Sequence, residues 1–217
     1  MVTEQTKQLD QINQMHTKLS NLTTDYWQSF SHIGTWQFWF MLSLLIFPLV
    51  ALYFLLDRKK AFHIGFFGFN IHVWLNYFDT FGVTHGLWNY QYKVVPFLPI
   101  SVALDTALVP VSFMLMYQWT LNRNKNYYLY LTGLSLFFSF LVKPAFVAFG
   151  IFKFYKETNF LHLFLGYITI MLVSKLITNI FMYLQKTETA STEQTEVKTF
   201  KRRSFLSKLF HFKQKAK

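Results

Sequence analysis

The 217-residue sequence contains no cysteine and few charged residues. The lack of Cys excludes disulfides, thiolate metal sites, iron–sulfur clusters and a Cys nucleophile. Charged residues make up 14% of the chain, against about 25% in an average soluble domain, whereas hydrophobic residues make up 53% and aromatic residues 21%. Because the apolar residues occur in long blocks, this composition is typical of an integral membrane protein.

Five blocks are long enough to cross the hydrocarbon core of a bilayer, which takes about 20 helical residues. We therefore predict an all-α, polytopic transmembrane bundle of about five spans over residues 37–184, flanked by tails at 1–36 and 185–217. Pro48 and Pro110 should bend their helices, and Lys143-Pro144 should kink or break the fourth span, because proline has no backbone N–H. The predicted spans are 38–56, 61–83, 98–119, 127–152 and 160–184.

The distribution of Lys and Arg outside these spans predicts the orientation. Fourteen lie in loops 57–60 and 121–126 and in the tail after residue 184, against five in the N-terminal tail and the other two loops. Since basic residues are retained on the cytoplasmic side, we expect the N-terminus outside and the C-terminus in the cytoplasm of a bacterial cytoplasmic membrane. The first 30 residues lack the regions of a signal peptide, so the first span is expected to direct insertion.

The N-terminal tail has the pattern of an amphipathic helix. Apolar residues recur there at intervals of three and four, at Leu9, Ile12, Met15, Leu19 and Leu22. Two interpretations remain open. The helix either lies at the membrane interface or packs against itself, or it forms a coiled coil with a partner.

The C-terminal tail combines an apolar helix face with many basic residues. Phe205, Leu209 and Phe212 would share one face of a helix, and seven Lys or Arg lie between 201 and 217. This pattern favours binding to anionic lipid of the inner leaflet over binding to nucleic acid. The residues predicted to contact the membrane surface are Lys201, Arg202, Arg203, Lys208 and Lys213.

Three consecutive predicted spans carry polar residues at helical spacing, so each has a polar stripe to turn away from lipid. Ionisable side chains within a span are costly unless they are paired or hydrated. We expect Asp105 to pair with Lys143. Such a cluster either fixes helix packing as a buried salt bridge or forms a ligand site. Its predicted members are His72, Asn76, Asp79, Ser101, Asp105, Ser139 and Lys143.

The segment 84–99, which joins the second and third spans, is rich in aromatic residues and also contains Gly86, Pro96 and Pro99. It is either an ordinary aromatic belt at the membrane surface or a lid over the polar cluster, formed by His85, Trp88 and Tyr90. No metal-binding spacing of His, phosphate-binding loop or Ser-centred elbow is present. The sequence therefore predicts no metal and no cofactor.

Several short motifs of aromatic, glycine, proline and charged residues follow one another along about residues 26–184. They are Tyr26-Trp27, Thr35-Trp36-Gln37, Asp57-Arg58-Lys59, Asp79 with Gly86-Leu87-Trp88, Tyr92-Lys93, Asp105 with Pro110, and Pro144 with Gly150-Ile151. In these motifs the chain resembles a family of small, uncharacterised multipass membrane proteins of Bacillus- and Clostridium-type spore-formers. In that family an acidic residue precedes the proline of the fourth span, whereas this chain has Lys143.

A fainter similarity involves Asp79, the run Gly86-Leu87-Trp88-Asn89-Tyr90, and Leu98-Pro99. These residues are similar to the membrane domain of the bacterial and fungal lycopene cyclases. In those enzymes an acidic pair follows the Leu-Pro and protonates an alkene, whereas this chain has Ile100, Ser101 and Val102. The similarity therefore implies a shared architecture that holds an isoprenoid or lipid between helices, without cyclase activity.

These features together predict a non-enzymatic membrane protein that binds a lipid-like or isoprenoid molecule, or one that scaffolds membrane partners. One alternative is an intramembrane enzyme that modifies a lipid or isoprenoid, with Asp105 or Asp79 as acid or base. Another is a small transporter that uses the same charges. Large Phe-rich faces also permit the chain to form homo-oligomers.

Overall fold

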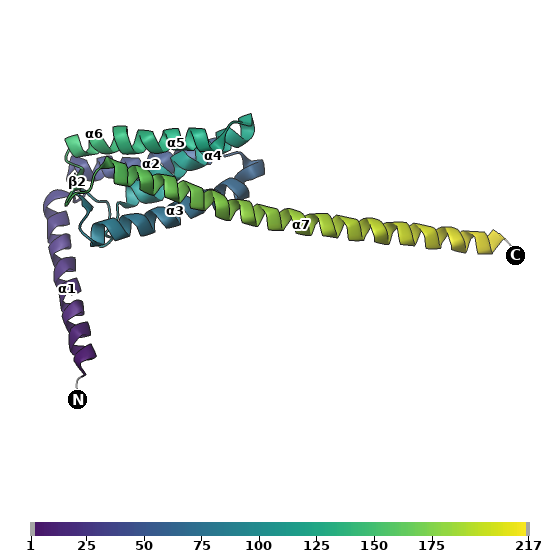
Figure 1. Ribbon diagram of the computed structural model, residues 1–217, viewed down its shortest axis with the longest axis horizontal. Helices are drawn as coiled ribbons and strands as arrows, with labels where there is room; N and C mark the ends of the chain where they lie inside the picture. Colours follow the sequence, from purple (N-terminus) through teal and green to yellow (C-terminus); the bar gives the residue numbers. More distant parts are fainter. Residues whose placement is uncertain (1–2, 216–217) are drawn as a thin grey trace. The chain divides into compact units, whose positions relative to one another are not determined.

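A computed structural model describes the backbone of residues 3–215 and the side chains of residues 3–187. The chain divides into two compact units, Met1–Lys175 and Leu176–Lys217, and the packing described below belongs to the first. Most of the chain is helical (Figure 1). The helices are α1 (Glu4–Phe30), α2 (Trp36–Leu55), the 3-10 turn η1 (Arg58–Lys60), α3 (Ala61–Thr84), α4 (Val109–Arg123), α5 (Tyr127–Phe137), α6 (Lys143–Ala148) and α7 (Phe160–Lys215).

Within residues 3–187, three helical segments are long and apolar enough to cross a membrane: α2, the segment Tyr127–Ala148 that contains α5 and α6, and the part Phe160–Thr187 of α7. Helix α3 is also long enough, but its Asn70, Asn76 and Asp79 lower its hydropathy. The predicted all-α fold is therefore confirmed, and three of the described segments, instead of five, are both long enough and apolar enough to span a membrane.

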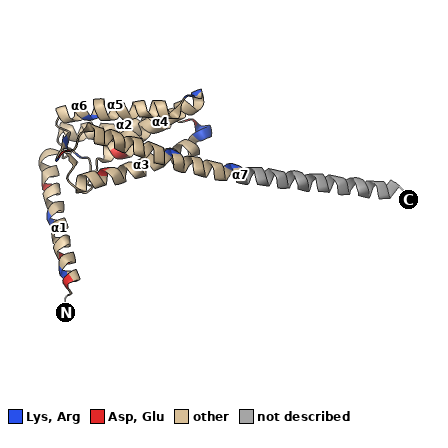
Figure 2. Ribbon diagram, in the orientation of Figure 1, with Lys and Arg blue, Asp and Glu red and all other residues tan. Residues whose placement is uncertain are grey.

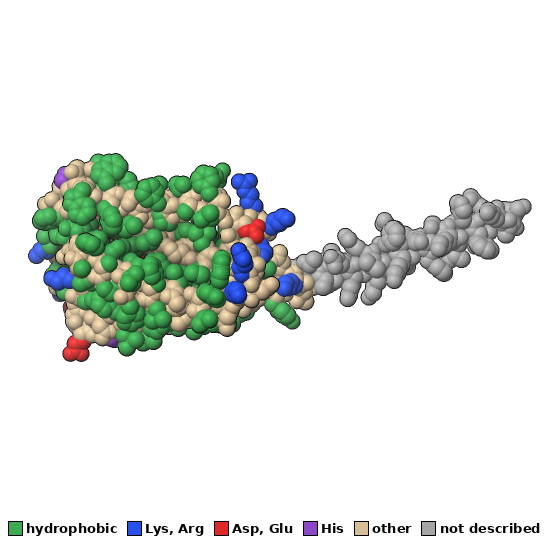
Figure 3. All heavy atoms as spheres, turned by 90° about the horizontal axis from the view of Figure 1, so that it is seen from above, with side chains coloured by type: hydrophobic (Ala, Val, Ile, Leu, Met, Phe, Trp, Pro, Cys, Tyr) green, Lys and Arg blue, Asp and Glu red, His purple; other side chains and the backbone are tan. Residues whose placement is uncertain are grey.

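Helix α4 lies at the centre of the packing, where it contacts α2, α3 and α5 (Figure 1). Phe67, Phe113, Tyr117, Leu131 and Met171 are almost completely buried in this core. The outward faces are also apolar, and Figure 3 shows hydrophobic side chains covering the flank of the bundle. An apolar exterior of this extent is what a lipid environment requires, since lipid tails do not hydrogen-bond.

Two helices widen into π-turns directly before a proline. The turn η2 (Ala103–Leu108) leads into α4 and its Pro110, and η3 (Phe138–Val142) leads into α6 and its Pro144. At the end of each turn a backbone N–H donates to the carbonyl five residues earlier instead of four. The expected distortions at both prolines thus take the form of a local widening, and the helices continue beyond them.

The structure also contains two short strands, which the sequence analysis missed. Strand β1 (Trp88–Tyr90) pairs antiparallel with β2 (Phe152–Phe154), so that Trp88 lies opposite Phe154 and Tyr90 opposite Phe152. Two predicted spans are shorter in the structure than expected. The fourth helical segment ends at Ala148 instead of reaching residue 152, and the third begins near residue 102 instead of 98, after Pro99.

Helix α3 and strand β1 pack closely at Gly82. A Cβ atom at this position would lie 1.9 Å from Cζ2 of Trp88, which is far inside van der Waals contact. On the same helix, a Cβ atom at Gly65 would meet no atom within 4 Å. Glycine at position 82 is therefore required by the indole ring of the adjacent strand.

We expect Gly82→Ala to lower the free energy of unfolding in mild detergent by about 1–3 kcal/mol, because the methyl group would displace the buried Trp88 ring. The control Gly65→Ala should be neutral or stabilise by up to about 1 kcal/mol, because alanine favours the helix. Unfolding monitored by tryptophan fluorescence measures both. Equal effects of the two substitutions would contradict the close packing of α3 against β1.

Candidate functional site

Asp79 lies near the end of α3 and is buried, with 4% of its surface exposed. Its Oδ1 atom accepts two hydrogen bonds, from Nε1 of Trp88 and from the hydroxyl of Tyr90, both at 2.8 Å. Both donors belong to strand β1. The strand therefore closes over the carboxyl group and supplies two of its hydrogen bonds.

Strands β1 and β2 together form a cover over Asp79, named here the β1–β2 lid (residues 88–90 and 152–154). Gly86 and Gly150, with φ of 64° and 66°, lead the chain out of α3 and α6 into the strands. These left-handed conformations favour glycine, because a Cβ atom would be strained there. Trp88, Tyr90 and Phe152 turn inward and are almost fully buried.

Asp105 lies within the π-turn η2 and is 2% exposed. Its Oδ2 accepts a hydrogen bond of 3.1 Å from the backbone N–H of Ser101, so the side chain caps the start of its own helical segment. The Asp105 carboxyl group also lies close enough to Asp79 for the two groups to interact electrostatically. The structure therefore brings together the two carboxyl groups that the sequence analysis assigned to different spans.

The backbone carbonyl of Asp105 explains the positions of two further predicted residues. In a regular α-helix the Asp105 carbonyl would accept from the N–H of Val109, but in the π-turn that N–H bonds to the carbonyl of Leu104. The next residue is Pro110, which has no N–H to donate. Nδ1 of His72 lies 2.9 Å from the carbonyl oxygen, and Nδ2 of Asn76 lies at 3.5 Å. The histidine contact requires the tautomer with the proton on Nδ1. His72 and Asn76 thus replace the donor that the proline lacks.

Lys143 is the first residue of α6 and is 4% exposed. Its Nζ donates to the Tyr90 hydroxyl at 3.1 Å and lies 4.1 Å from the ring centre of Phe152. Lys143 and Asp105 attract each other electrostatically, but no direct ion pair joins them among the described residues. The Tyr90 hydroxyl instead connects the ammonium group to Asp79, accepting from one and donating to the other.

Three buried polar atoms of the cluster have no hydrogen-bond partner among the described residues. They are Oδ2 of Asp79, Oγ of Ser101 and Oγ of Ser139, and both serines are completely buried. Buried polar atoms are normally hydrogen-bonded to protein or to water, so these three atoms are the part of the cluster with hydrogen-bonding capacity left unused by the described residues.

Two residues near the cluster were missed by the sequence analysis. Tyr167 of α7 is buried between the rings of Phe113 and Phe138 and interacts electrostatically with both carboxyl groups. Lys93 donates to the backbone carbonyls of residues 98 and 99, at 3.2 and 2.7 Å. Burial lowers the pKa of Lys93, whereas the nearby carboxyl groups act in the opposite direction. No local pattern in the sequence distinguishes these residues from ordinary loop and core residues.

His85, the third predicted lid residue, lies apart from the lid. It is exposed, its Nδ1 is 2.9 Å from the carbonyl oxygen of Phe81, and its ring packs on the Phe81 ring. Its own carbonyl accepts a hydrogen bond from Lys156. His85 therefore helps to hold the loop after α3 and does not face Asp79.

A second polar network lies deeper in the bundle, away from the lid. Nζ of Lys175 donates to the hydroxyl of Tyr117 at 2.8 Å, and Nε2 of His63 lies 2.9 Å from the same oxygen. The ammonium group also lies 4.5 Å from the centre of the Tyr117 ring. Lys175 is thus held by hydrogen bonding and by aromatic contact.

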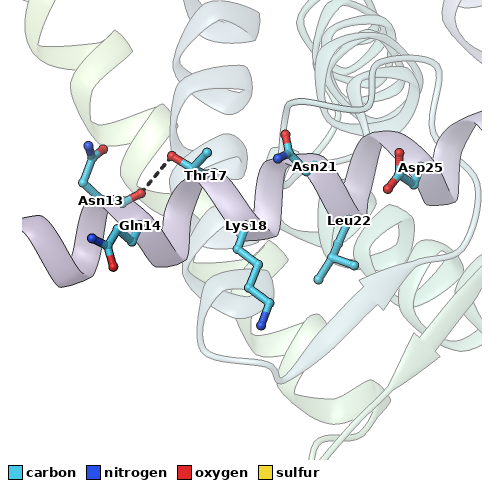
Figure 4. Close-up of a pocket in the computed structure, with 7 residues that line it drawn as sticks. All are labelled: Asn13, Gln14, Thr17, Lys18, Asn21, Leu22 and Asp25. Carbon is cyan, nitrogen blue, oxygen red and sulfur yellow. Dashed lines mark hydrogen bonds between the residues drawn. The ribbon is translucent and has the colours of Figure 1, made fainter.

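The pocket shown in Figure 4 is a different kind of feature. All seven residues that line it belong to helix α1, and it forms no part of the buried cluster. The apolar stripe predicted for this helix is present and exposed, with Met15 at 70%. The pocket is therefore open surface along one helix. Its residues are Asn13, Gln14, Thr17, Lys18, Asn21, Leu22 and Asp25.

The predicted membrane-surface residues of the C-terminal tail, Lys201, Arg202, Arg203, Lys208 and Lys213, lie outside the residues whose side chains are described. Within residues 3–187, no three His, Asp or Glu side chains come together in a group that could hold a metal ion. No protein-family model, curated protein or solved structure matches the chain. The chemistry of the cluster therefore rests on its own geometry.

We expect Tyr90→Phe to lower the free energy of unfolding in mild detergent by about 1–3 kcal/mol. The substitution keeps the ring but removes the hydroxyl that joins Lys143 to Asp79, which leaves both groups buried with fewer partners. Tyr53→Phe is a matched control, because Tyr53 is 70% exposed. If both variants unfold like the wild type, the Tyr90 hydroxyl does not connect the cluster.

Proposed function

We propose that this chain is a non-enzymatic integral membrane protein of the bacterial cytoplasmic membrane that binds a lipid-like molecule at its buried polar cluster. The observation that carries this proposal is the convergence of Asp79, Asp105 and Lys143, each at most 4% exposed, beneath the β1–β2 lid. Ionisable groups at such depth are costly and mark functional sites in membrane proteins. Since apolar helices surround the cluster, a molecule that reaches it from the bilayer must itself be largely apolar.

The loop positions support the proposed five spans. Loops 57–60 and 121–126 lie at one end of the bundle, where Nζ of Lys60 donates to Oδ1 of Asn122 and the Gln118 amide bonds to the backbone of residues 55 and 57. The loops that carry β1 and β2 pair with each other. Figure 2 shows basic residues at the turns between helices. Loops that lie alternately at the two ends of a bundle are what five antiparallel spans produce. In this arrangement α3 is the second span and η2–α4 is the third.

The unpartnered oxygens support ligand binding over a purely structural role. A salt bridge that only fixed helix packing would be expected to satisfy its own polar atoms, whereas Oγ of Ser101, Oγ of Ser139 and Oδ2 of Asp79 lack partners in the described region. These oxygens give a hydroxyl, amide or ammonium group of a ligand places to bind. The aromatic residues of the lid would cover its apolar part.

A small transporter is the second candidate, and the two π-turns favour it. Both η2 and η3 lie at the cluster and precede a proline, and helices interrupted at membrane depth commonly carry substrate or ion sites. Asp105 lies in one turn, and Ser139 in the other. Transport would require the lid to open on one side and a second opening toward the cytoplasm.

The proposal also includes membership in the family of small multipass proteins of spore-formers, which the motifs around Asp79, Asp105 and Pro144 suggest. We further propose that the basic C-terminal tail binds anionic lipid of the inner leaflet, which agrees with an N-terminus outside and a C-terminus in the cytoplasm.

The ligand proposal predicts that a lipid other than the bulk lipids co-purifies with the wild type in mild detergent, at one molecule per chain. Native mass spectrometry of wild type and Asp105→Asn should show this species only in the wild type. Asp25→Asn, which removes the same charge from exposed α1, should retain it. If none of the three retains such a lipid, the cluster is structural and the binding proposal is wrong.

The proposed orientation predicts which loops a membrane-impermeant thiol reagent reaches from outside. Because the chain has no native cysteine, single substitutions are unambiguous probes. In intact cells Glu157→Cys should react and Lys125→Cys should not, although both positions are exposed. After cell lysis both should react. Labelling of position 125 in intact cells would reverse the proposed orientation.

A further inference from the structure

We propose that the end of the bundle formed by loops 57–60 and 121–126, named here the basic end, binds the headgroups of anionic phospholipids. It lies at the opposite end of α3 from the β1–β2 lid. The proposal rests on the proposed membrane location of the chain, but it concerns a separate surface and a separate class of lipid. It also adds a folded binding surface to the one proposed for the C-terminal tail.

The basic end carries an excess of positive charge. Five of the six charged residues in its two loops are basic and one is acidic, and Figure 3 shows Lys and Arg side chains gathered at one end of the bundle. Oδ1 of Asp57 accepts a hydrogen bond from the backbone N–H of Lys59, so the single carboxylate caps its own turn. The six charged residues are Asp57, Arg58, Lys59, Lys60, Arg123 and Lys125.

Four of the five cations are available to a ligand. Arg58, Lys59, Arg123 and Lys125 are exposed, and none of their side chains forms an ion pair or a hydrogen bond with a described residue. Lys60 is half-buried and donates instead to Oδ1 of Asn122. The hydrogen-bonding capacity of the four exposed side chains is therefore left for a molecule outside the described part of the chain.

Hydrogen bonds hold the two loops together as one surface. Besides the bond from Lys60 to Asn122, the Gln118 side chain accepts from the backbone N–H of Asp57 and donates to the carbonyl of Leu55, both at 2.8 Å. These bonds fix positive charges of both loops at the same end of the bundle. Because like charges that share a surface raise its positive potential, the surface attracts anions.

Aromatic residues beside the loops indicate how deep the basic end lies in the proposed membrane. Tyr53 near the end of α2, Trp119 near the end of α4 and Tyr128 at the start of α5 are all exposed, and each lies within five residues of an exposed Lys or Arg. Tyr and Trp concentrate at the boundary between the acyl chains and the headgroups. Basic residues just beyond this boundary lie at the level of the lipid phosphates.

The basic groups at the lid end are used differently. Lys93 and Lys156 donate to backbone carbonyls of their own chain, and the ammonium group of Lys153 lies over the ring of Tyr155. The acidic Glu157 follows Lys156 directly. Among the described residues, the positive charge available to an anionic headgroup is therefore concentrated at the basic end.

Electron spin resonance of spin-labelled lipids tests the proposal on the full chain in phosphatidylcholine vesicles. Lipid in contact with the protein is motionally restricted, so the restricted fractions of labelled phosphatidylglycerol and labelled phosphatidylcholine compare the two headgroups. The wild type should favour the anionic lipid several-fold, since one basic residue near the surface contributes up to about fivefold in affinity. The preference should fall as the salt concentration rises.

The double variant Arg123→Gln/Lys125→Gln should lower this preference by about twofold or more. No described residue pairs with either side chain, so the fold should be retained. The matched control is Lys7→Gln/Lys18→Gln, which removes the same charge from exposed positions on α1 and should leave the preference unchanged. An equal loss in both double variants would overturn the proposal, because net charge alone would then explain the preference.

The tail variant Lys201→Gln/Arg202→Gln measures the contribution of the C-terminal tail. If this variant loses the preference and the Arg123→Gln/Lys125→Gln variant keeps it, the tail alone binds anionic lipid and the proposal is wrong. Restricted lipid without any headgroup preference in the wild type would also overturn it, while leaving the proposed membrane location intact. A chain that restricts no lipid at all would contradict the membrane location itself, and the basic end with it.

Discussion

Pro110 removes one backbone N–H from a helix that is buried among other apolar helices. The adjacent turn widens, and the carbonyl of Asp105 is left without a donor from its own helix. Side chains of α3, His72 and Asn76, fill that position, which fixes α3 against the start of α4. The same contact holds Asp105 beside α3, the helix that carries Asp79. The contacts of His72 and Asn76 can therefore be traced to this single missing donor.

The cluster also shows how a largely apolar bundle retains three ionisable side chains. A charged residue at the centre of a bilayer costs about 2.5–3.5 kcal/mol on insertion scales. The cost falls when groups of opposite sign share hydrogen bonds, as Lys143 and Asp79 do through Tyr90. The rings of Phe152 and Tyr90 add attraction to the ammonium group. Removal of any one member leaves the others buried with too few partners.

Hydrophobic blocks in the sequence predicted the helical fold, and the polar stripes indicated which residues the helices bring close to one another. The seven predicted cluster residues lie on α3, in or just before η2, and in the η3–α6 segment, and the spacing of His72, Asn76 and Asp79 identified the polar face of α3. The π-turns were harder to anticipate, because a proline predicts distortion but not its form. Strands β1 and β2 have three residues each, and they pair across loops that are far apart in the sequence. Tyr167 is flanked by apolar neighbours and is related to the site only through the tertiary fold.

The pairing of β1 with β2 affects how anything enters the cluster. The two strands come from different loops, so the backbone bonds between them fasten the end of α3 to the end of α6. Trp88 and Tyr90 belong to the paired strand β1 and are buried, so their side chains are held in place together with both strands. For the proposed ligand binding, entry would require the ends of α3 and α6 to separate as a group, against the lateral pressure of a surrounding bilayer. The thickness and tension of that bilayer would then determine how often the proposed site opens.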